Sequence, residues 1–348
     1  NQDRFAEADS QLLRALAIAD GIPDANEAMA LCVNRLRILR TQGRSAALAW
    51  IEEIDRRHTV DLPNPRAWTQ SRFAACETLR DAGRYGEAWI KLGQERGKVA
   101  LHASGVAPAW DVAEAGLWLD LGQHARAVAP AQRLARAAAD PAIAPWLRAR
   151  ALLVQAQVRA RVNGQGLDDR PDEQAWALLD AAAVCAPRDS RRAAWYEVVL
   201  QRAAWGDAAS GAALAEGLAA PAAALGLIGY ARRAWWLACG RSLDAGQIAA
   251  ARRCAAQAEA LATHVFDSAA GPEAVLPTGG CERAIDAVRL QLARATGDAA
   301  VAAPARAAQV RLQQTVDQHV PAEWRDGFLQ RQPVQLTLQR RIAELASA

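Results

Sequence analysis

Glycine residues recur along this chain at a nearly constant interval, and that interval limits the possible folds more than any other sequence feature. Each glycine lies in a short polar turn between two apolar stretches of helical composition. The glycines are Gly43, Gly83, Gly122, Gly164, Gly206, Gly246 and Gly297. The first five steps span 39–42 residues and the last spans 51. Such a period is typical of repeat proteins, in which each unit buries its apolar face against the next unit.

Each of these glycines predicts the turn of a helical hairpin. A helix often ends in a residue of left-handed conformation, which glycine adopts without steric cost. Two antiparallel helices joined by such a turn form one unit. The fourth unit differs, because the segment 166–171 lengthens its turn, so its second helix is expected to begin near Asp172. The segment 270–279, with Pro272 and Pro277, accounts for the long last step.

The composition agrees with an all-α fold. Alanine, the best helix former, supplies about a quarter of the chain, and arginine supplies nearly all of the 41 basic residues. β-Branched residues are sparse, which disfavours a sheet-based fold. We therefore predict one domain over residues 1–348. It consists of an N-terminal helix (1–22), about seven helical hairpins of about 40 residues (23–320) and C-terminal capping helices (321–348).

Residues at fixed distances from the turn glycines also recur. Small residues lie five positions after several of them, as expected where two helices pack closely. These include Ala88, Ala127, Gly211 and Ala251. Cys76 and Cys239 both lie seven positions before a turn glycine, which predicts buried structural thiols rather than ligands or disulfide partners.

Two local patterns resemble a known repeat family. The segment Ala82-Gly-Arg-Tyr-Gly-Glu-Ala88 resembles the centre of a tetratricopeptide repeat, and Trp195 and Trp235 match the aromatic start of the first helix in that repeat. The units here are longer than the usual 34 residues of that family. Long, Ala- and Leu-rich repeats of this kind resemble the superhelical sensor region of bacterial signal-transduction ATPases of the STAND type, which include transcription activators of the maltose-regulon type.

The C-terminal segment adds to this resemblance. Residues 320–346 are similar to the tail that closes many such proteins, where a short helix ends in Arg-x-x-Phe-Leu, a proline follows and a last helix ends in Leu-Ala. The matching residues are Arg325, Phe328, Leu329, Pro333, Ile342 and Leu345. The resemblance implies a tetratricopeptide-like α-solenoid that is not an enzyme. An inducer or a partner protein would bind it and relieve the autoinhibition of an ATPase domain elsewhere in a cytoplasmic bacterial regulator.

Three other functions compete with this one. The first is a free-standing scaffold or adaptor that binds a peptide. The second is an enzyme, for which we find no phosphate-binding loop, no Gly-x-Ser-x-Gly elbow and no metal-ligand spacing among the five histidines. The third is direct nucleic-acid binding, which a net charge of only +3, with acidic residues interleaved among the arginines, disfavours. We predict no cofactor, no metal, no membrane span and no nucleic-acid partner.

The candidate binding residues follow from the resemblance, because the first helix of each hairpin lines the concave surface of tetratricopeptide arrays. Inward positions then lie about three, six and ten residues before each turn glycine. They combine aromatic side chains with arginines that could hold carboxylates or phosphates, or that could simply favour helix C-termini. We expect a protein or peptide partner, or a small-molecule inducer, to contact Arg37, Arg40, Phe73, Glu77, Arg80, Tyr196, Trp236 and Arg294. Trp235 is the expected packing residue and its neighbour Trp236 the expected groove residue.

Overall fold

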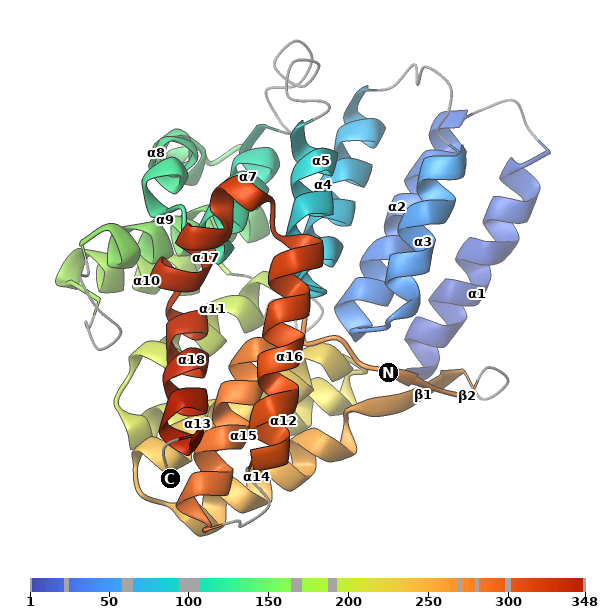
Figure 1. The fold of residues 1–348 in the computed structure, drawn as a ribbon. Coiled ribbons are helices and arrows are strands. Elements are labelled where there is room, and N and C mark those ends of the chain that lie inside the picture. The colour runs from blue at the N-terminus through green and yellow to red at the C-terminus, as the bar shows by residue number, and fades with distance from the viewer. Residues whose placement is uncertain are drawn as a thin grey trace.

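The computed structural model confirms that the protein is all-α. It describes residues 2–21, 25–57, 65–93, 107–163, 171–186, 193–267, 271–278, 282–297 and 302–346. Successive helices lie side by side along the chain, as Figure 1 shows most clearly for the row α1 to α5. No helix in these ranges is both long enough and apolar enough to cross a bilayer.

The helices follow the predicted hairpins. The first helices of the seven hairpins are α2 (Ala25–Gln42), α4 (Pro65–Asp81), α7 (Ala107–Asp120), α9 (Pro145–Asn163), α11 (Ala193–Trp205), α13 (Ile228–Asp244) and α15 (Glu282–Ala295). Their partners are α3 (Ala46–Arg57), α5 (Tyr85–Gly93), α8 (His124–Ala139), α10 (Glu173–Cys185), α12 (Ala208–Ala224), α14 (Ile248–Ala260) and α16 (Ala302–His319). The chain begins with α1 (Gln2–Ala19) and ends with a 3-10 turn (Ala322–Trp324), α17 (Arg325–Arg331) and α18 (Pro333–Ala346).

Most of the predicted turn glycines adopt the left-handed conformation. Gly43, Gly83, Gly122, Gly246 and Gly297 have φ between 65° and 79°. At the first four, the residue after the glycine donates to the carbonyl five residues before it, as in Arg44 N to Leu39 O at 2.9 Å, the pattern of a Schellman motif.

One of the predicted turns ends differently. The turn at Gly206 continues into an Asp207 cap, whose carboxylate accepts from the N–H of Ser210. Gly164 lies outside the described residues.

Two further details concern the helix ends. Helix α10 begins where the sequence predicts, because Asp172 is its N-cap and accepts from the N–H of Ala175 at 2.7 Å. Gly226, between α12 and α13, has φ 78° and closes a turn that the sequence analysis did not predict.

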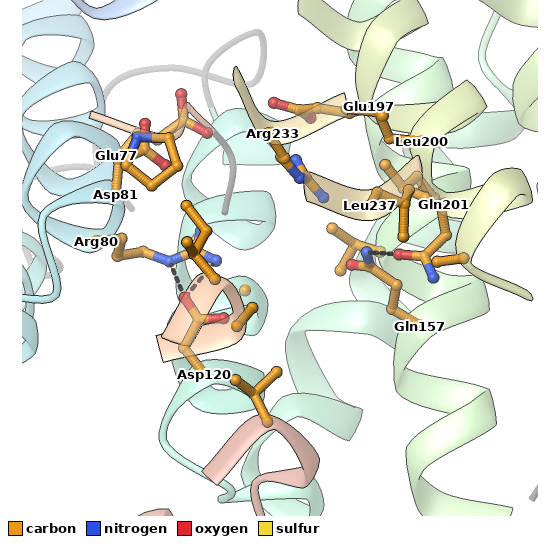
Figure 2. A pocket seen from close by; sticks show the side chains of 18 of the residues that line it. Glu77, Arg80, Asp81, Asp120, Gln157, Glu197, Leu200, Gln201, Arg233 and Leu237 are labelled. Carbon is orange, nitrogen blue, oxygen red and sulfur yellow. Dashed lines mark hydrogen bonds and ion pairs between the residues drawn. The ribbon is translucent and has the colours of Figure 1, made fainter. Parts of the chain in front are cut away.

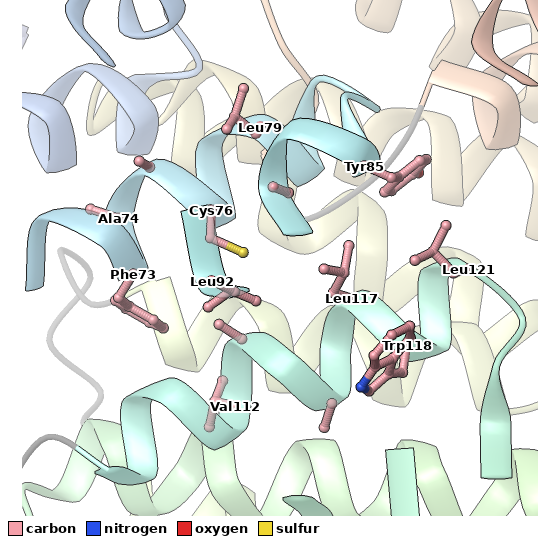
Figure 3. Close-up of a cluster of buried hydrophobic side chains, with 14 of the residues drawn as sticks. Phe73, Ala74, Cys76, Leu79, Tyr85, Leu92, Val112, Leu117, Trp118 and Leu121 are labelled. Carbon is pink, nitrogen blue, oxygen red and sulfur yellow. The ribbon is translucent and has the colours of Figure 1, made fainter. Parts of the chain in front are cut away.

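Cysteine and small residues occupy the helix interfaces as expected. Cys76 and Cys239 are fully buried, as are Ala88, Ala127 and Ala251. Figure 3 shows Cys76 among apolar side chains of α4, α5 and α7. Burial raises the pKa of each of the two thiols to about 12, so both stay protonated and unreactive at neutral pH.

A two-stranded hairpin interrupts the helices after α14 and was not predicted from the composition. Strand β1 (Thr263–Asp267) pairs antiparallel with β2 (Gly271–Ala274). β-Branched and aromatic residues are concentrated in β1, and Pro272 and Pro277 disfavour helix in this stretch. The segment after β2 then contacts the turn between α2 and α3, where the N–H of Leu276 donates to the carbonyl of Gly43 at 2.7 Å.

This contact brings the first and sixth hairpins together. Helix α13 packs against α2, and the backbones of Gly43 and Gly229 approach so closely that neither position has room for a side chain. Thr278 Oγ1 donates to the carbonyl of Arg40 at 3.0 Å, and Arg44 pairs with Glu273 of β2 at 2.7 Å. The row of helices therefore curves until elements about 185 residues apart in the chain are in contact, through backbone groups and an ion pair.

The C-terminal segment also reaches back along the chain. Trp324 packs edge-on against Trp89 and Trp118, with ring centroids 5.3 and 4.9 Å apart, and Phe328 lies 5.6 Å from Tyr85. Helix α18 packs against α15 and α16. Residues 321–346 thus cover the last hairpin, as a cap would, and also contact the second and third hairpins beside α5 and α7 (Figure 1).

We expect Gly229→Ala to destabilise the protein by about 2 kcal/mol, because the new Cβ would lie 2.6 Å from the carbonyl oxygen of Leu276 and against Thr278 Oγ1. Gly217→Ala is the matched control, since its Cβ meets no atom within 4 Å and alanine favours the α12 helix. Urea unfolding of the two variants measures the difference. Equal stability would show that the α2–α13 approach is not tightly packed.

Candidate functional site

A cavity of about 430 Å³ lies on the inner side of the curved row of helices. The first helix of every predicted hairpin, from α2 to α15, contributes to its lining. Outside these helices, Tyr85 of α5 and Pro277, Gln332 and Val334 complete it. Its size lies in the range of small-molecule sites.

The lining combines balanced charges with apolar surface. Four arginines and four carboxylates face one another: Arg40, Arg80, Arg150, Arg233, Glu77, Asp81, Asp120 and Glu197. Aliphatic side chains lie between them, and Gln157 donates to Gln201 across α9 and α11 at 2.7 Å (Figure 2). A polar ligand with an apolar part matches this mixture.

Four of the eight candidate residues lie together in this lining. They are Arg40, Glu77, Arg80 and Trp236. Glu77 lies six residues before its turn glycine, Trp236 ten residues before, and the two arginines three residues before, so all three inward spacings place residues in the cavity.

The other four candidates lie elsewhere. Phe73 and Tyr196 are buried in the core, where Arg150 lies over the Phe73 ring and Tyr196 packs against Trp195 and Tyr230. These rings fill the gaps between adjacent first helices instead of facing the cavity. Arg37 is half-buried outside the lining. Arg294 is exposed and pairs with Glu344 of α18, because that helix packs against α15.

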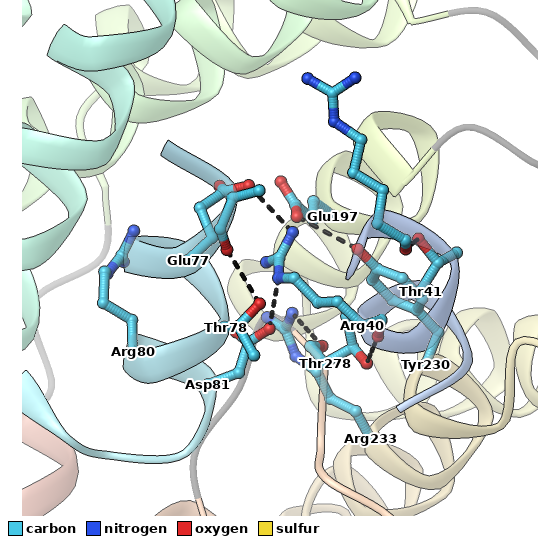
Figure 4. Close-up of polar contacts among 12 residues, drawn as sticks. Arg40, Thr41, Glu77, Thr78, Arg80, Asp81, Glu197, Tyr230, Arg233 and Thr278 are labelled. Atoms are coloured by element: carbon cyan, nitrogen blue, oxygen red, sulfur yellow. Dashed lines mark hydrogen bonds and ion pairs between the residues drawn. The ribbon is translucent and has the colours of Figure 1, made fainter. Parts of the chain in front are cut away.

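A buried chain of opposite charges joins the helices around the cavity. Arg40 pairs with Asp81 at 2.7 Å and with Glu77 at 2.9 Å (Figure 4). Glu77 also pairs with Arg150. Arg150 continues to Glu197 at 3.1 Å, whose carboxylate lies 3.2 Å from the Tyr230 hydroxyl. The chain links α2, α4, α9, α11 and α13. We call these residues the charge network.

The network decides the protonation of its members. Burial alone would raise the pKa of Glu77, but the charges of Arg150 and Arg40 outweigh it and lower this pKa to about 2. Burial raises the pKa of Asp81, and the opposing charges of Arg40 and Arg80 do not outweigh it. Burial also raises the pKa of Tyr230, which keeps that hydroxyl neutral. Glu77 is therefore ionised at every physiological pH.

A second pair lies beside the network. Arg80 binds Asp120 of α7 at 2.8 Å, and its guanidinium occupies the space next to Gly116. A Cβ at Gly116 would lie 2.6 Å from Arg80 Nη2, so glycine is needed there for the arginine to cross to α7.

Several lining residues were not among the sequence candidates. Asp81 and Asp120 lie two residues before their turn glycines, and Arg150 and Arg233 lie 13 or 14 residues before theirs. The signal for these arginines was present, since the inward stripe of a first helix continues one turn further toward its N-terminus. Glu197 is the one charge in the apolar first part of α11, which is itself a sign of a buried partner.

The chemistry available here is binding by donors and ion pairs. Among the described residues, no three His, Cys, Asp or Glu side chains converge as a metal site. The carboxylates that line the cavity all have arginine partners. Arg233 extends into the space between the Arg80–Asp120 pair and the Gln157–Gln201 pair in the view of Figure 2.

Glu77→Gln is expected to lower the free energy of unfolding at pH 7 by about 3 kcal/mol, because Arg150 and Arg40 each lose a buried charged partner. The lowered pKa of Glu77 stabilises the fold above pH 4.5, and this stabilisation is lost as the pH falls toward 2. The difference between wild type and variant should therefore shrink over that interval. Urea unfolding at pH 7, 5 and 3 measures it, and a difference independent of pH would contradict the assignment.

Comparison with known proteins does not add to this geometry. No protein-family model matches the sequence, and no curated protein matches it. The function is therefore argued from the cavity and the helices that surround it.

Proposed function

We propose that this chain is a ligand-binding domain of tetratricopeptide-like superhelical architecture, whose cavity takes a small molecule. One observation carries the proposal: the first helices of all seven predicted hairpins converge on a single cavity of about 430 Å³. Repeated Schellman turns and small residues at the helix interfaces support the repeat architecture.

The shape of the lining favours a small molecule over an extended peptide. A peptide-binding superhelix needs a groove that is open along its length. Here Pro277 borders the cavity beside the α2–α13 contact, and Gln332 and Val334 of the C-terminal segment border it as well. These segments restrict a long chain more than a compact ligand. A free-standing peptide scaffold is therefore the weaker proposal.

We further propose that the domain acts as a sensor, as the resemblance to STAND-type ATPases implies. A ligand changes the state of a protein only if it binds one state better than another. The cavity is built from elements distant in the chain, so a ligand that contacts several first helices would favour the closed arrangement of the helices. The closed arrangement would then relieve the autoinhibition of an ATPase domain in the same protein.

A screen of small metabolites, sugars and short peptides tests the binding function. A ligand present at about 100 times its Kd should raise the Tm by about 4 °C. Ala204 lines the cavity, so Ala204→Trp should fill it and abolish the rise. Ala213→Trp on the exposed side of α12 is the control and should keep it.

Three results bear on this proposal. Loss of the rise in the Ala213→Trp control as well would point to a general effect of the substitution. An equal rise in Ala204→Trp would show that the ligand binds outside the cavity. In the full-length protein, a ligand that binds the cavity but leaves ATP hydrolysis unchanged would remove the sensor role.

A further inference from the structure

We propose that the ligand of this cavity is a small organic acid with one carboxylate and an apolar body, anchored by Arg233 and Trp236 of α13. This inference rests on the proposed function, because it names the chemical class of the same ligand. The inference is based on N–H donors in the lining of the cavity that have no acceptor in the described ranges of the chain.

Arg233 differs from the other arginines of the cavity. Arg40, Arg80 and Arg150 each form ion pairs with buried carboxylates. Within the part of the chain that the structure describes, no carboxylate pairs with Arg233. Its contact is with the backbone carbonyl of Thr278, at 3.5 Å from Nη1, which is the outer limit of a hydrogen bond. Its guanidinium therefore keeps most of its donors, in the fork geometry that fits a carboxylate.

Trp236 supplies a second donor on the same helix. Its side chain is 97% buried and lines the cavity, yet its indole Nε1 has no acceptor among the described residues. A buried N–H without a partner is costly, and a ligand acceptor would remove that cost. Arg233 and Trp236 are three residues apart, so they lie on one face of α13. One carboxylate could accept from both.

The other lining groups exclude competing ligand classes. A cationic ligand would need a carboxylate without a partner, but Glu77, Asp81, Asp120 and Glu197 are all engaged by arginines. The lining carries four positive and four negative side chains, so it offers no surplus for a multiply charged anion. A single carboxylate at Arg233 is therefore the largest negative charge that the site accommodates.

The apolar part of the lining fits the rest of such a molecule. Val112, Val154, Leu200, Leu237 and Val288 contribute aliphatic surface from five different helices. The Gln157–Gln201 pair leaves an amide N–H₂ and a carbonyl for one polar substituent on the ligand. A branched or cyclic hydrocarbon body on a carboxylate matches both features.

The experiment compares isosteric probes that differ only in the head group. The probes are 4-methylpentanoate, 4-methylpentanamide and 3-methylbutylamine, with the same three head groups on a phenylpropyl body, all measured by isothermal titration calorimetry. We expect the acids to bind at least about tenfold more tightly than their amides, because a charge-assisted bidentate contact is stronger than a neutral one. The amines should show no binding.

Variants then locate the anchor. Arg233→Gln should weaken the acids about tenfold or more and leave the amides nearly unchanged, and Arg233→Lys should restore part of the loss. Trp236→Phe keeps an aromatic ring but removes the indole N–H, together with the five-membered ring that carries it, so it should weaken the acids by about fivefold. Arg252→Gln on the exposed face of α14 removes the same charge outside the cavity and should have no effect.

The outcomes separate this inference from the proposed function. If the amides or amines bind as tightly as the acids, or if Arg233→Gln binds acids as well as wild type, the organic-acid inference is wrong. The small-molecule function is then still supported by any probe whose binding is lost in the Ala204→Trp variant. If no probe binds and no compound of the metabolite screen depends on Ala204, both proposals fail.

Discussion

The charge network is the interaction on which the rest of this structure depends. Arg40, Glu77, Arg150 and Glu197 are held out of water in alternating order, and the pairs are formed by residues 37 to 73 positions apart in the chain. A buried charge is costly unless its partners are in place. Since each middle member has two partners on different helices, no single hairpin satisfies its own charges. The first helices must therefore assemble together.

This requirement changes what a helical array can do. In a simple repeat protein each unit contacts only its neighbours, and the inner surface is an open groove. Here the network joins α2 to α9, α11 and α13 through shared carboxylates, and the Gly43–Gly229 approach holds the first and sixth hairpins in contact. The Trp89, Trp118 and Trp324 cluster fixes the C-terminal segment to the second and third hairpins. These long-range contacts enclose the inner surface as a cavity, so binding in that cavity and folding stability are coupled.

Some elements followed directly from sequence and others did not. The left-handed turn at Gly83 and the helix start at Asp172 were predicted because both are local, set by backbone sterics and by a side chain that caps its own helix. Trp236 was predicted to face inward from its spacing and from the resemblance to tetratricopeptide arrays. Phe73 and Tyr196 have the same spacing but fill gaps between helices, because small rotations of each helix decide which residue faces the cavity. The pairing of Arg150 with Glu77 and Glu197 was not predicted, because these partners are 47 or more residues away in the chain.

The sequence by itself determined the local architecture of this protein. The spacing of glycines fixed where helices end, and the abundance of alanine fixed that they are helices that pack closely. Only the tertiary structure decided how far the row of helices curves, and that β2 and the segment after it contact the Gly43 turn. It also decided that Arg233 has no carboxylate partner among the residues that the structure describes. The physical reason is that hairpin formation depends on contacts within about 40 residues, which a repeat period records. Curvature and charge pairing depend on contacts across the whole chain, and the repeat period does not record those contacts.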